Sequence, residues 1–286
     1  MLKYLVLALL LAFPAHASSF EQWKLHFQQR LISQGHNPQA VSRILEQVDF
    51  DPRVIELDRK QPEGRITLVE YVEKTLHPLR IRKGRQYLED YRGILSQVQQ
   101  RYGVPPEIIV ALWGKESDYG GYVGNFETLS ALATLAYEGR RRDYFEGELT
   151  AAIELVQRYG WKVRDVRGSW AGAIGQCQFM PSHYAHDAVD ADGDGRIDLW
   201  NSSADIFASM AQLLKDKGWQ PGLEWGYRID HPETVRLRSG YRLYQPDGPN
   251  GPSYVITPNF DVLKRWNNSG YFATAVGRLA DKISQP

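Results

Sequence analysis

The chain has 286 residues, of which 43% are apolar, and it carries 34 acidic and 34 basic residues. This length and apolar content suffice for one large domain, or for a core with appendages. A formal net charge of zero gives no reason to expect a nucleic-acid partner, because such proteins present a basic surface. The single cysteine, Cys177, excludes an intrachain disulfide, and without an evident histidine partner it is expected to be a packed thiol.

Residues 1–17 have the layout of a secretory signal peptide. Lys3 precedes an apolar stretch from Tyr4 to Phe13, and the small-residue site Ala15-His16-Ala17 follows. The apolar stretch is too short to span a bilayer. A buried N-terminal helix is the alternative. Since no cysteine lies near the cleavage site, we expect no lipid or other membrane anchor, and the sequence predicts an exported, soluble protein.

Helical periodicity dominates the chain after the signal. Apolar residues at helical spacing occupy residues 20–31, and a second helix start, Asn37-Pro38, precedes another apolar stripe, so a helical hairpin is predicted. The stretch from Asp51 to Gly64 is polar and contains two prolines, and it is expected to be extended or looped. Helical character returns from Leu79 to Tyr102. Residues 18–100 are assigned to an N-terminal helical subdomain.

The rest of the chain is predicted to be mostly helical with one β excursion. The expected helices are Pro105–Ser117, Thr128–Tyr137, Asp143–Tyr159, Ser203–Lys217, Pro258–Arg265 and Phe272–Ile283. From Glu224 to Thr257, alternating residues such as Val235–Arg238 are punctuated by Gly and Pro, which indicates a small β-rich insertion. The predicted divisions are a core of residues 101–223, the insertion 224–257, and C-terminal helices 258–286 that complete the core.

Glu116 stands at the end of one of these apolar helices. Prolines begin the helix at Val104-Pro105-Pro106, and its apolar residues form one stripe with Glu116 near the centre. Glu116 is therefore expected to point toward the core, where desolvation raises the pKa of a carboxyl group toward the range of a general acid. A buried glutamate with a structural partner is the alternative. Lys115, at the edge of the stripe, can reach water and need not pair with Glu116.

Small residues, amides and aromatic rings are concentrated in residues 168–182. The glycines and alanines there let a backbone approach a ligand closely. Ser169 and Gln178 can form hydrogen bonds with the hydroxyl or acetamido groups of a sugar. A tight helix-packing turn with aromatic core residues is the alternative. The rings that could stack on sugars are Trp170, Phe179 and Tyr119.

Residues 190–198 match the first nine positions of an EF-hand calcium loop, with acids at positions 1, 3, 5 and 9 and glycine at position 6. Asn201 replaces the glutamate expected at position 12, so Asp205 is the candidate for the closing carboxylate and the loop is drawn over residues 190–205. A solvated acidic turn without metal is the alternative. Calcium here would be structural. The expected ligands are Asp190, Asp192, Asp194, Arg196 and Asp205.

The motifs in this order closely resemble those of the lytic murein transglycosylase B family, glycoside hydrolase family 103. The resemblance implies a mainly α fold: a lysozyme-like catalytic core with an EF-hand-like calcium loop, acting in the periplasm on the glycan strands of peptidoglycan. No organic cofactor is expected, and cell-wall synthesis or division proteins are candidate partners. The segments that carry the resemblance are the region of Tyr71, Val104–Glu107, Gly114–Gly120, Ala131–Leu135, Arg140–Leu149, Gly168–Ser182, Asp190–Asp198 and Arg265–Ser269.

By this resemblance Glu116 is the single catalytic acid and base. It would protonate the glycosidic oxygen between N-acetylmuramic acid and N-acetylglucosamine, then accept the proton of the muramic C6 hydroxyl as that oxygen closes onto C1. Lys115 replaces a residue that is usually apolar in the family, which could alter the pKa of Glu116. A lysozyme-type hydrolase and a non-catalytic, calcium-stabilised peptidoglycan-binding protein remain alternatives. The implied substrate contacts are Tyr71, Arg140, Arg141, Ser169, Gln178, Phe179 and Asn267.

Overall fold

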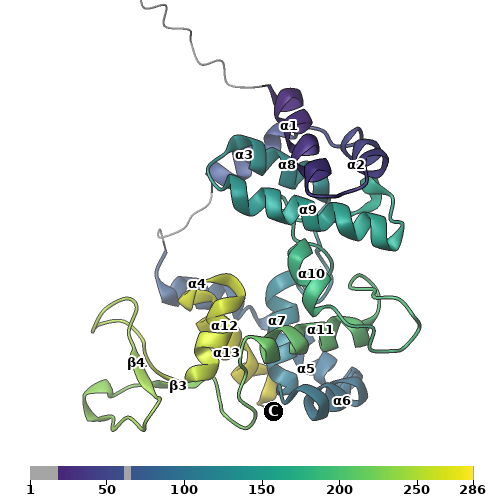
Figure 1. Cartoon of the computed structure of the whole chain (residues 1–286). Coiled ribbons are helices and arrows are strands. Elements are labelled where there is room, and N and C mark those ends of the chain that lie inside the picture. The colour runs from purple at the N-terminus through teal and green to yellow at the C-terminus, as the bar shows by residue number, and fades with distance from the viewer. Residues whose placement is uncertain (1–18, 61–65, 286) are drawn as a thin grey trace, which may run out of the picture. The chain divides into compact units, whose positions relative to one another are not determined.

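The computed structural model describes residues 19–60 and 66–285, which fold into thirteen α-helices and a few short strands (Figure 1). The predicted signal peptide lies outside the described residues. The prediction of a mainly α fold is confirmed. No helix in the described chain combines the length and the apolarity that crossing a membrane requires.

Two compact units make up the described chain, divided between Glu46 and Gln47. The first holds the predicted helical hairpin, α1 (Phe20–Ser33) and α2 (Pro38–Leu45). The side chain of Ser19 accepts a hydrogen bond from the backbone of α1 and begins that helix with a capping box. The predicted boundary near residue 100 differs from this division, and the domain assignment stays a prediction.

The prediction of an extended or looped segment from Asp51 to Gly64 is wrong for its first part, which forms α3 (Pro52–Arg59). Asp51 caps this helix by accepting a hydrogen bond from the backbone N–H of Arg53, 3.0 Å away. Pro52 occupies the first turn, where a backbone N–H has no partner within the helix, so the missing N–H of proline costs no hydrogen bond. Only Val54 and Asp58 are buried. The helix is therefore too polar and too short to show in the apolar pattern.

The second unit is built around α7 (Pro106–Ser117), in which every residue from Ile108 to Gly114 is buried. It contacts α5, α6, α11 and α13, while α8 and α9 lie side by side (Figure 1). The remaining helices of this unit are α4 (Leu68–Thr75), α5 (Pro78–Asp90), α6 (Arg92–Tyr102), α8 (Thr128–Glu138), α9 (Arg142–Tyr159), α10 (Pro181–Asp187), α11 (Ser203–Asp216), α12 (Pro258–Asn267) and α13 (Gly270–Ser284).

Two small antiparallel sheets complete the second unit. In the first, β1 (Phe126–Glu127) pairs with β2 (Arg167–Gly168), which leads into the predicted sugar-binding motif. The predicted β excursion is confirmed as a three-stranded sheet in the order β3-β5-β4. Val235–Arg238, cited above for its alternation, lies in no strand. The strands are β3 (Gly226–Ile229), β4 (Arg242–Tyr244) and β5 (Ser253–Ile256).

Gln176 fastens the loop of residues 168–180 to α7. Its Oε1 accepts a hydrogen bond of 2.7 Å from the indole Nε1 of Trp113, and its Nε2 donates one of 2.5 Å to the backbone carbonyl of Trp200. Gly120, just beyond α7, has a φ of 79°, and a Cβ there would overlap the Gln176 amide. Gly120, at the end of the Gly114–Gly120 segment, is thus required both by the left-handed backbone and by the close approach of Gln176.

We predict that Gly120→Ala destabilises the protein more than Gly160→Ala does. Gly160, at the end of α9, has a φ of 64° and no atom within 4 Å of its Cβ position, so its replacement brings backbone strain alone, about 1 kcal/mol. At Gly120 the methyl group must also displace Gln176 and break its hydrogen bonds, which adds about 1–3 kcal/mol. Urea denaturation measures both losses. If the two variants lose the same stability, the Gln176 amide does not obstruct a side chain at position 120.

Candidate active site

Left-handed backbone conformations mark the region around Glu116. Non-glycine residues rarely adopt positive φ, and such strain of about 1–3 kcal/mol per residue clusters at functional sites. In the described chain each of these residues lies at, or within two positions of, a predicted site residue. They are Asp118, Tyr119, Gln178 and Asn268, with φ of 49°, 63°, 50° and 44°.

Glu116 lies half-buried in the last turn of α7. Burial raises the pKa of its carboxyl group from an ordinary 4.5 to about 7, while the charge of Lys115 and a hydrogen bond from Trp266 act to lower it. A carboxyl group with this pKa exchanges its proton near neutral pH. The Glu116 carboxyl group therefore has the raised pKa that its position on the apolar stripe predicts.

Trp266, on α12, is the residue that sequence analysis missed. It belongs to a segment that carries the family resemblance, but no spacing distinguishes it from other aromatic residues of amphipathic helices. Its ring centroid lies 5.6 Å from that of Phe179, which is 2% exposed. Phe179 thus packs against Trp266, and Trp266 in turn contacts Glu116.

Cys177 is buried near Glu116, as a packed thiol. Its Sγ donates a hydrogen bond of 3.5 Å to the backbone carbonyl of Ile206. Burial above all, and the neighbouring charge of Glu116, raise the pKa of this thiol well above its usual range. A thiol kept protonated is a poor nucleophile, which is consistent with a structural role.

Asp118, the acid closest to Glu116 in sequence, is directed toward α5. Its two oxygens pair with Arg80 Nε and Lys83 Nζ, each 3.2 Å away. Burial raises the pKa of Asp118, but the hydrogen bonds and charges of Lys83 and Arg80 outweigh burial, and the pKa lies below its usual range. Asp118 is therefore an ionised anchor for α5 and does not provide a second catalytic carboxylate beside Glu116.

Tyr71, a predicted substrate contact, reaches this region from α4. The Nζ of Lys115 lies 5.0 Å from the centroid of its ring, and the ring of Tyr271 packs edge-on at 5.9 Å. Tyr71 itself is half-buried. The structure thus brings Tyr71 next to the residue that precedes Glu116, which is consistent with the predicted contact.

The predicted polar contacts Ser169, Gln178 and Asn267 retain groups that a ligand could use. The Oγ of Ser169 accepts a backbone N–H at 3.0 Å, which leaves its hydroxyl proton to donate. The Nε2 of Gln178 donates to the carbonyl of Val123 at 3.1 Å, whereas its amide oxygen has no hydrogen bond within the described residues. Asn267 is exposed at the end of α12.

The prediction that Tyr119 offers its face to a sugar ring is wrong. Tyr119 is only 6% exposed, and its ring packs against Tyr87 and Trp113 at centroid distances of 5.1 and 5.3 Å. Its hydroxyl donates a hydrogen bond of 2.8 Å to the backbone carbonyl of Arg80. The left-handed turn after α7 directs this side chain into the core. Phe179 is likewise too buried to contact a sugar face directly.

Arg140 and Arg141 both pair with Asp58 of α3, with Arg141 Nη2 at 3.1 Å from Asp58 Oδ1. The carboxylate is buried, whereas about half of each arginine side chain is exposed. Two cations on one anion leave a net positive charge at the surface. Within the described residues no hydrogen bond, ion pair or ring contact connects this pair to Glu116, so their predicted place farther out remains a prediction.

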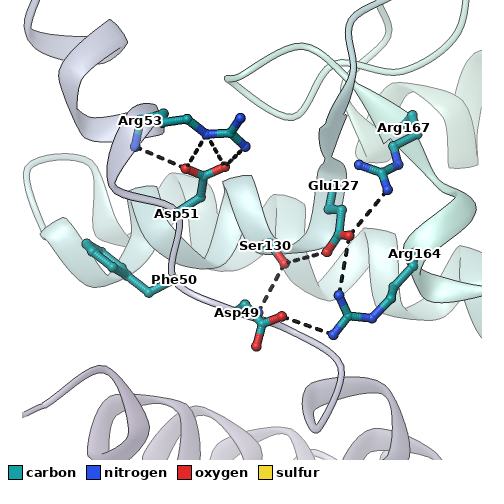
Figure 2. A pocket seen from close by; sticks show the side chains of 8 residues that line it. All are labelled: Asp49, Phe50, Asp51, Arg53, Glu127, Ser130, Arg164 and Arg167. Carbon is teal, nitrogen blue, oxygen red and sulfur yellow. Dashed lines mark hydrogen bonds and ion pairs between the residues drawn. The ribbon is translucent and has the colours of Figure 1, made fainter.

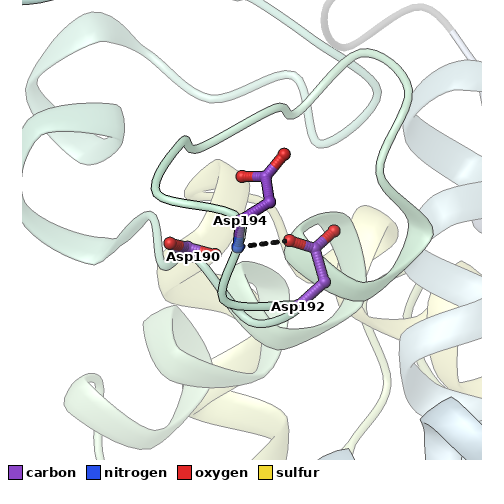
Figure 3. Close-up of side chains that lie close together, drawn as sticks. All are labelled: Asp190, Asp192 and Asp194. Atoms are coloured by element: carbon purple, nitrogen blue, oxygen red, sulfur yellow. Dashed lines mark hydrogen bonds between the residues drawn. The ribbon is translucent and has the colours of Figure 1, made fainter.

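Three predicted metal ligands gather on the loop before α11: one carboxylate oxygen from each of Asp190, Asp192 and Asp194 lies within 4.8 Å of the others (Figure 3). The backbone of the loop supports them, because the N–H groups of Gly193 and Gly195 both donate to Asp190. Clustered carboxylates suit a hard divalent cation such as Ca²⁺.

Asp205 does not join this cluster, and its predicted role as the closing ligand is not supported. Its Oδ1 accepts the backbone N–H of Ala191 at 2.7 Å and its Oδ2 accepts that of Asp198 at 2.8 Å. Asp205 is buried at the start of α11, so it ties the loop ends to that helix. Arg196, at position 7, would contribute only its backbone carbonyl in an EF-hand-like arrangement.

A separate pocket of about 210 Å³ contains none of the predicted site residues (Figure 2). Its charged side chains neutralise one another: Arg164 pairs with Asp49 and Glu127, and Arg167 also pairs with Glu127. These ion pairs hold the segment before α3 against β1. The pocket is lined by Asp49, Phe50, Asp51, Arg53, Glu127, Ser130, Arg164 and Arg167.

We predict that Glu116→Gln stabilises the protein at high pH only. The folded-state pKa of Glu116 is about 7, above the ordinary 4.5. Between these two pH values Glu116 stays protonated in the native state but is ionised in the unfolded state, so the stability of the wild type falls as the pH rises through this window. The glutamine variant does not lose this stability. Above pH 7 its free energy of unfolding exceeds that of the wild type by at most about 3 kcal/mol.

Urea denaturation at pH 4 and at pH 8 measures this effect, with Glu73→Gln on the exposed face of α4 as the control. The difference between Glu116→Gln and wild type should be present at pH 8 and vanish at pH 4. A difference that is the same at both pH values would contradict the burial of the Glu116 carboxyl group.

Solved structures of known transglycosylases share this fold. SltB3 from Pseudomonas aeruginosa, in complex with NAG-NAM-pentapeptide, is 37% identical with a TM-score of 0.86, covering 94% of this chain and 80% of that chain. SltB3 in complex with NAG-anhNAM-pentapeptide gives a TM-score of 0.85, with 37% identity over 93% of this chain and 80% of that one. Slt35 from Escherichia coli, in complex with calcium, is 30% identical with a TM-score of 0.77, covering 91% and 92% of the two chains.

Sequence comparisons agree with the structural ones. The membrane-bound lytic murein transglycosylase B of Escherichia coli strain K12 is 31% identical over 284 residues, which cover 90% of this chain and 77% of the relative. The model of the transglycosylase SLT domain matches residues 19–281. These matches show that the chain belongs to the transglycosylase SLT domain family and is a lytic transglycosylase with a lysozyme-like fold.

Proposed function

We propose that Glu116 is the single acid and base with which this lytic transglycosylase cleaves the β-1,4 bond between N-acetylmuramic acid and N-acetylglucosamine in peptidoglycan. The observation that carries the proposal is its carboxyl group at the end of α7, with a pKa of about 7. Near neutral pH such a group is present in both forms, as required of one that first donates and then accepts a proton.

The reaction needs two proton transfers at one carboxyl group. Protonated Glu116 donates its proton to the glycosidic oxygen as the bond from that oxygen to the muramic C1 breaks. The carboxylate then accepts the proton of the muramic C6 hydroxyl while the C6 oxygen bonds to C1. The product ends in 1,6-anhydro-N-acetylmuramic acid, and no water is consumed.

A single carboxylate suffices because the substrate supplies its own nucleophile. Ordinary glycosidases use a second carboxylate to activate water or to attack C1. Asp118, the nearest acid in sequence, is held by Arg80 and Lys83. The complexes of SltB3 with NAG-NAM-pentapeptide and with NAG-anhNAM-pentapeptide support the same classes of substrate and product here.

The glycan would lie against the side chains gathered around Glu116. Ser169 and Gln178 have free hydrogen-bonding capacity for acetamido or hydroxyl groups, and Asn267 is exposed at the end of α12. Tyr71 provides an aromatic surface from α4. Arg140 and Arg141, with their excess positive charge, suit the carboxylates of a peptide stem farther from the cleavage site.

Export to the periplasm is part of the proposal. The signal-peptide pattern of residues 1–17 supports it, and so does a substrate that lies outside the cytoplasmic membrane.

Calcium binding at the loop of residues 190–196 is also proposed, with ligands from Asp190, Asp192, Asp194 and the backbone carbonyl of Arg196. When bound, calcium neutralises the repulsion among the three carboxylates. The complex of Slt35 with calcium supports calcium binding by this chain. Because the loop connects α10 to α11, and α11 contacts α7, the ion would stabilise the core that positions Glu116.

We predict that Glu116→Gln lowers turnover of purified murein by about 10²–10⁴-fold, because general acid–base catalysis is worth that much. Mass spectrometry of the muropeptides measures both the rate and the product. Asp118→Asn is the matched control, since asparagine tolerates the left-handed backbone, and it should retain most of the wild-type rate. Wild-type products with reducing ends and no anhydro ring would instead identify a hydrolase.

We predict that calcium raises the melting temperature and that chelation lowers it. A ligand present at a hundredfold excess over its dissociation constant stabilises the native state by about 2.7 kcal/mol. Asp192→Asn combined with Asp194→Asn should abolish the response, whereas Asp230→Asn, on an exposed residue outside the loop, should keep it. If titration calorimetry detects no calcium binding, the proposed site is wrong.

A further inference from the structure

The ammonium group of Lys115 is held in place by two aromatic rings. Its Nζ lies 5.0 Å from the ring centroid of Tyr71 on α4 and 5.6 Å from that of Phe272 on α13. Distances below about 6 Å give a favourable cation–π attraction. α13 contacts both α7 and α4, so three helices fix this cation one residue before Glu116.

No carboxylate neutralises Lys115 within the described residues: none lies within 4 Å of its Nζ. Asp247, the acid that binds the hydroxyl of Tyr271, is occupied, because it accepts hydrogen bonds from that hydroxyl at 2.5 Å and from the backbone N–H of Leu68 at 2.8 Å. Rings attract a cation without cancelling its charge. The field of Lys115 therefore remains available to Glu116.

Lys115 is the cation whose charge acts on the Glu116 carboxyl group, because the other groups around Glu116 are paired or uncharged. On α5, Arg80 and Lys83 are paired with Asp118. In the loop before α10, Cys177 stays protonated because burial raises its pKa. From α12, Trp266 donates an uncharged hydrogen bond, and from α4 the phenol of Tyr71 faces Lys115. The charge of Lys115 is also the one that acts to lower the pKa of Glu116.

We propose that Lys115 is a positioning residue of the reaction, fixed by the faces of Tyr71 and Phe272 so that its ammonium stabilises the Glu116 carboxylate left after proton donation. The inference rests on the proposed role of Glu116. As the proton moves to the glycosidic oxygen and the bond from that oxygen to C1 breaks, negative charge develops on Glu116 within the field of a cation that is already in place. Such preorganised charge needs no rearrangement at the moment of reaction.

Lys115→Met tests this inference, because methionine keeps an unbranched apolar stem and removes the charge. The titration of Glu116 is followed in the free enzyme by carbon-13 NMR of labelled glutamate carboxyl groups, with the signal assigned by its loss in Glu116→Gln. We expect the midpoint to move to higher pH by about half a unit, a threefold change in proton affinity. Lys115→Arg should restore the wild-type midpoint, and Lys162→Met, on an exposed residue, should leave it unchanged.

Kinetics on murein provide a second readout. In Lys115→Met the fall in turnover at high pH should move in the same direction as the titration midpoint, with kcat lowered and KM little changed. An unchanged midpoint would overturn the inference. A raised KM with an unchanged midpoint would also overturn it, and would make Lys115 an anchor for a substrate carboxylate.

Failure of this inference and failure of the proposed function give different results. If Glu116→Gln still forms anhydro products at the wild-type rate, the proposed function is wrong whatever Lys115 does. If Glu116→Gln is inactive and the midpoint in Lys115→Met is unchanged, only the role of Lys115 is wrong. Lys115→Gln, which also removes the charge, replaces Lys115→Met if the methionine variant does not fold.

Discussion

Desolvation of one carboxyl group at the end of a buried helix is the constraint on which the rest of the site depends. α7 is buried from Ile108 to Gly114, so the core determines where the helix ends and what surrounds Glu116. Removing water from a carboxyl group disfavours its charged form, and the charge of Lys115 and the hydrogen bond from Trp266 offset only part of this effect. The resulting pKa of about 7 makes Glu116 both a proton donor and a proton acceptor at neutral pH.

The elements around α7 determine the surroundings of Glu116, which is half-buried. Gln176 joins the loop of residues 168–180 to α7 through Trp113, and Trp266 reaches Glu116 from α12. The left-handed residues Asp118 and Tyr119 end the helix so that one side chain anchors α5 and the other enters the core. These contacts account for a site with one free carboxylate, which suits a reaction whose nucleophile belongs to the substrate.

The sequence predicts the features that periodicity and motif spacing encode. The helix of Glu116, the burial of that acid, the acidic loop and the β excursion all follow from local patterns. What it misses depends on backbone direction or on partners far along the chain. Tyr119 enters the core because of a left-handed turn. α3 depends on the cap from Asp51 and on packing against α8. Asp205 accepts hydrogen bonds from backbone N–H groups instead of joining the acidic cluster. Trp266 becomes recognisable only when the fold brings its side chain to Glu116.

The central claim is that the C6 hydroxyl of the substrate takes the place of water. Digestion of murein in water enriched in oxygen-18 tests it most directly, with mass spectrometry of the newly formed muramic ends. The account predicts anhydro ends that contain no oxygen-18, because no water enters the product. Incorporation of oxygen-18 at C1 of the muramic residue would contradict it.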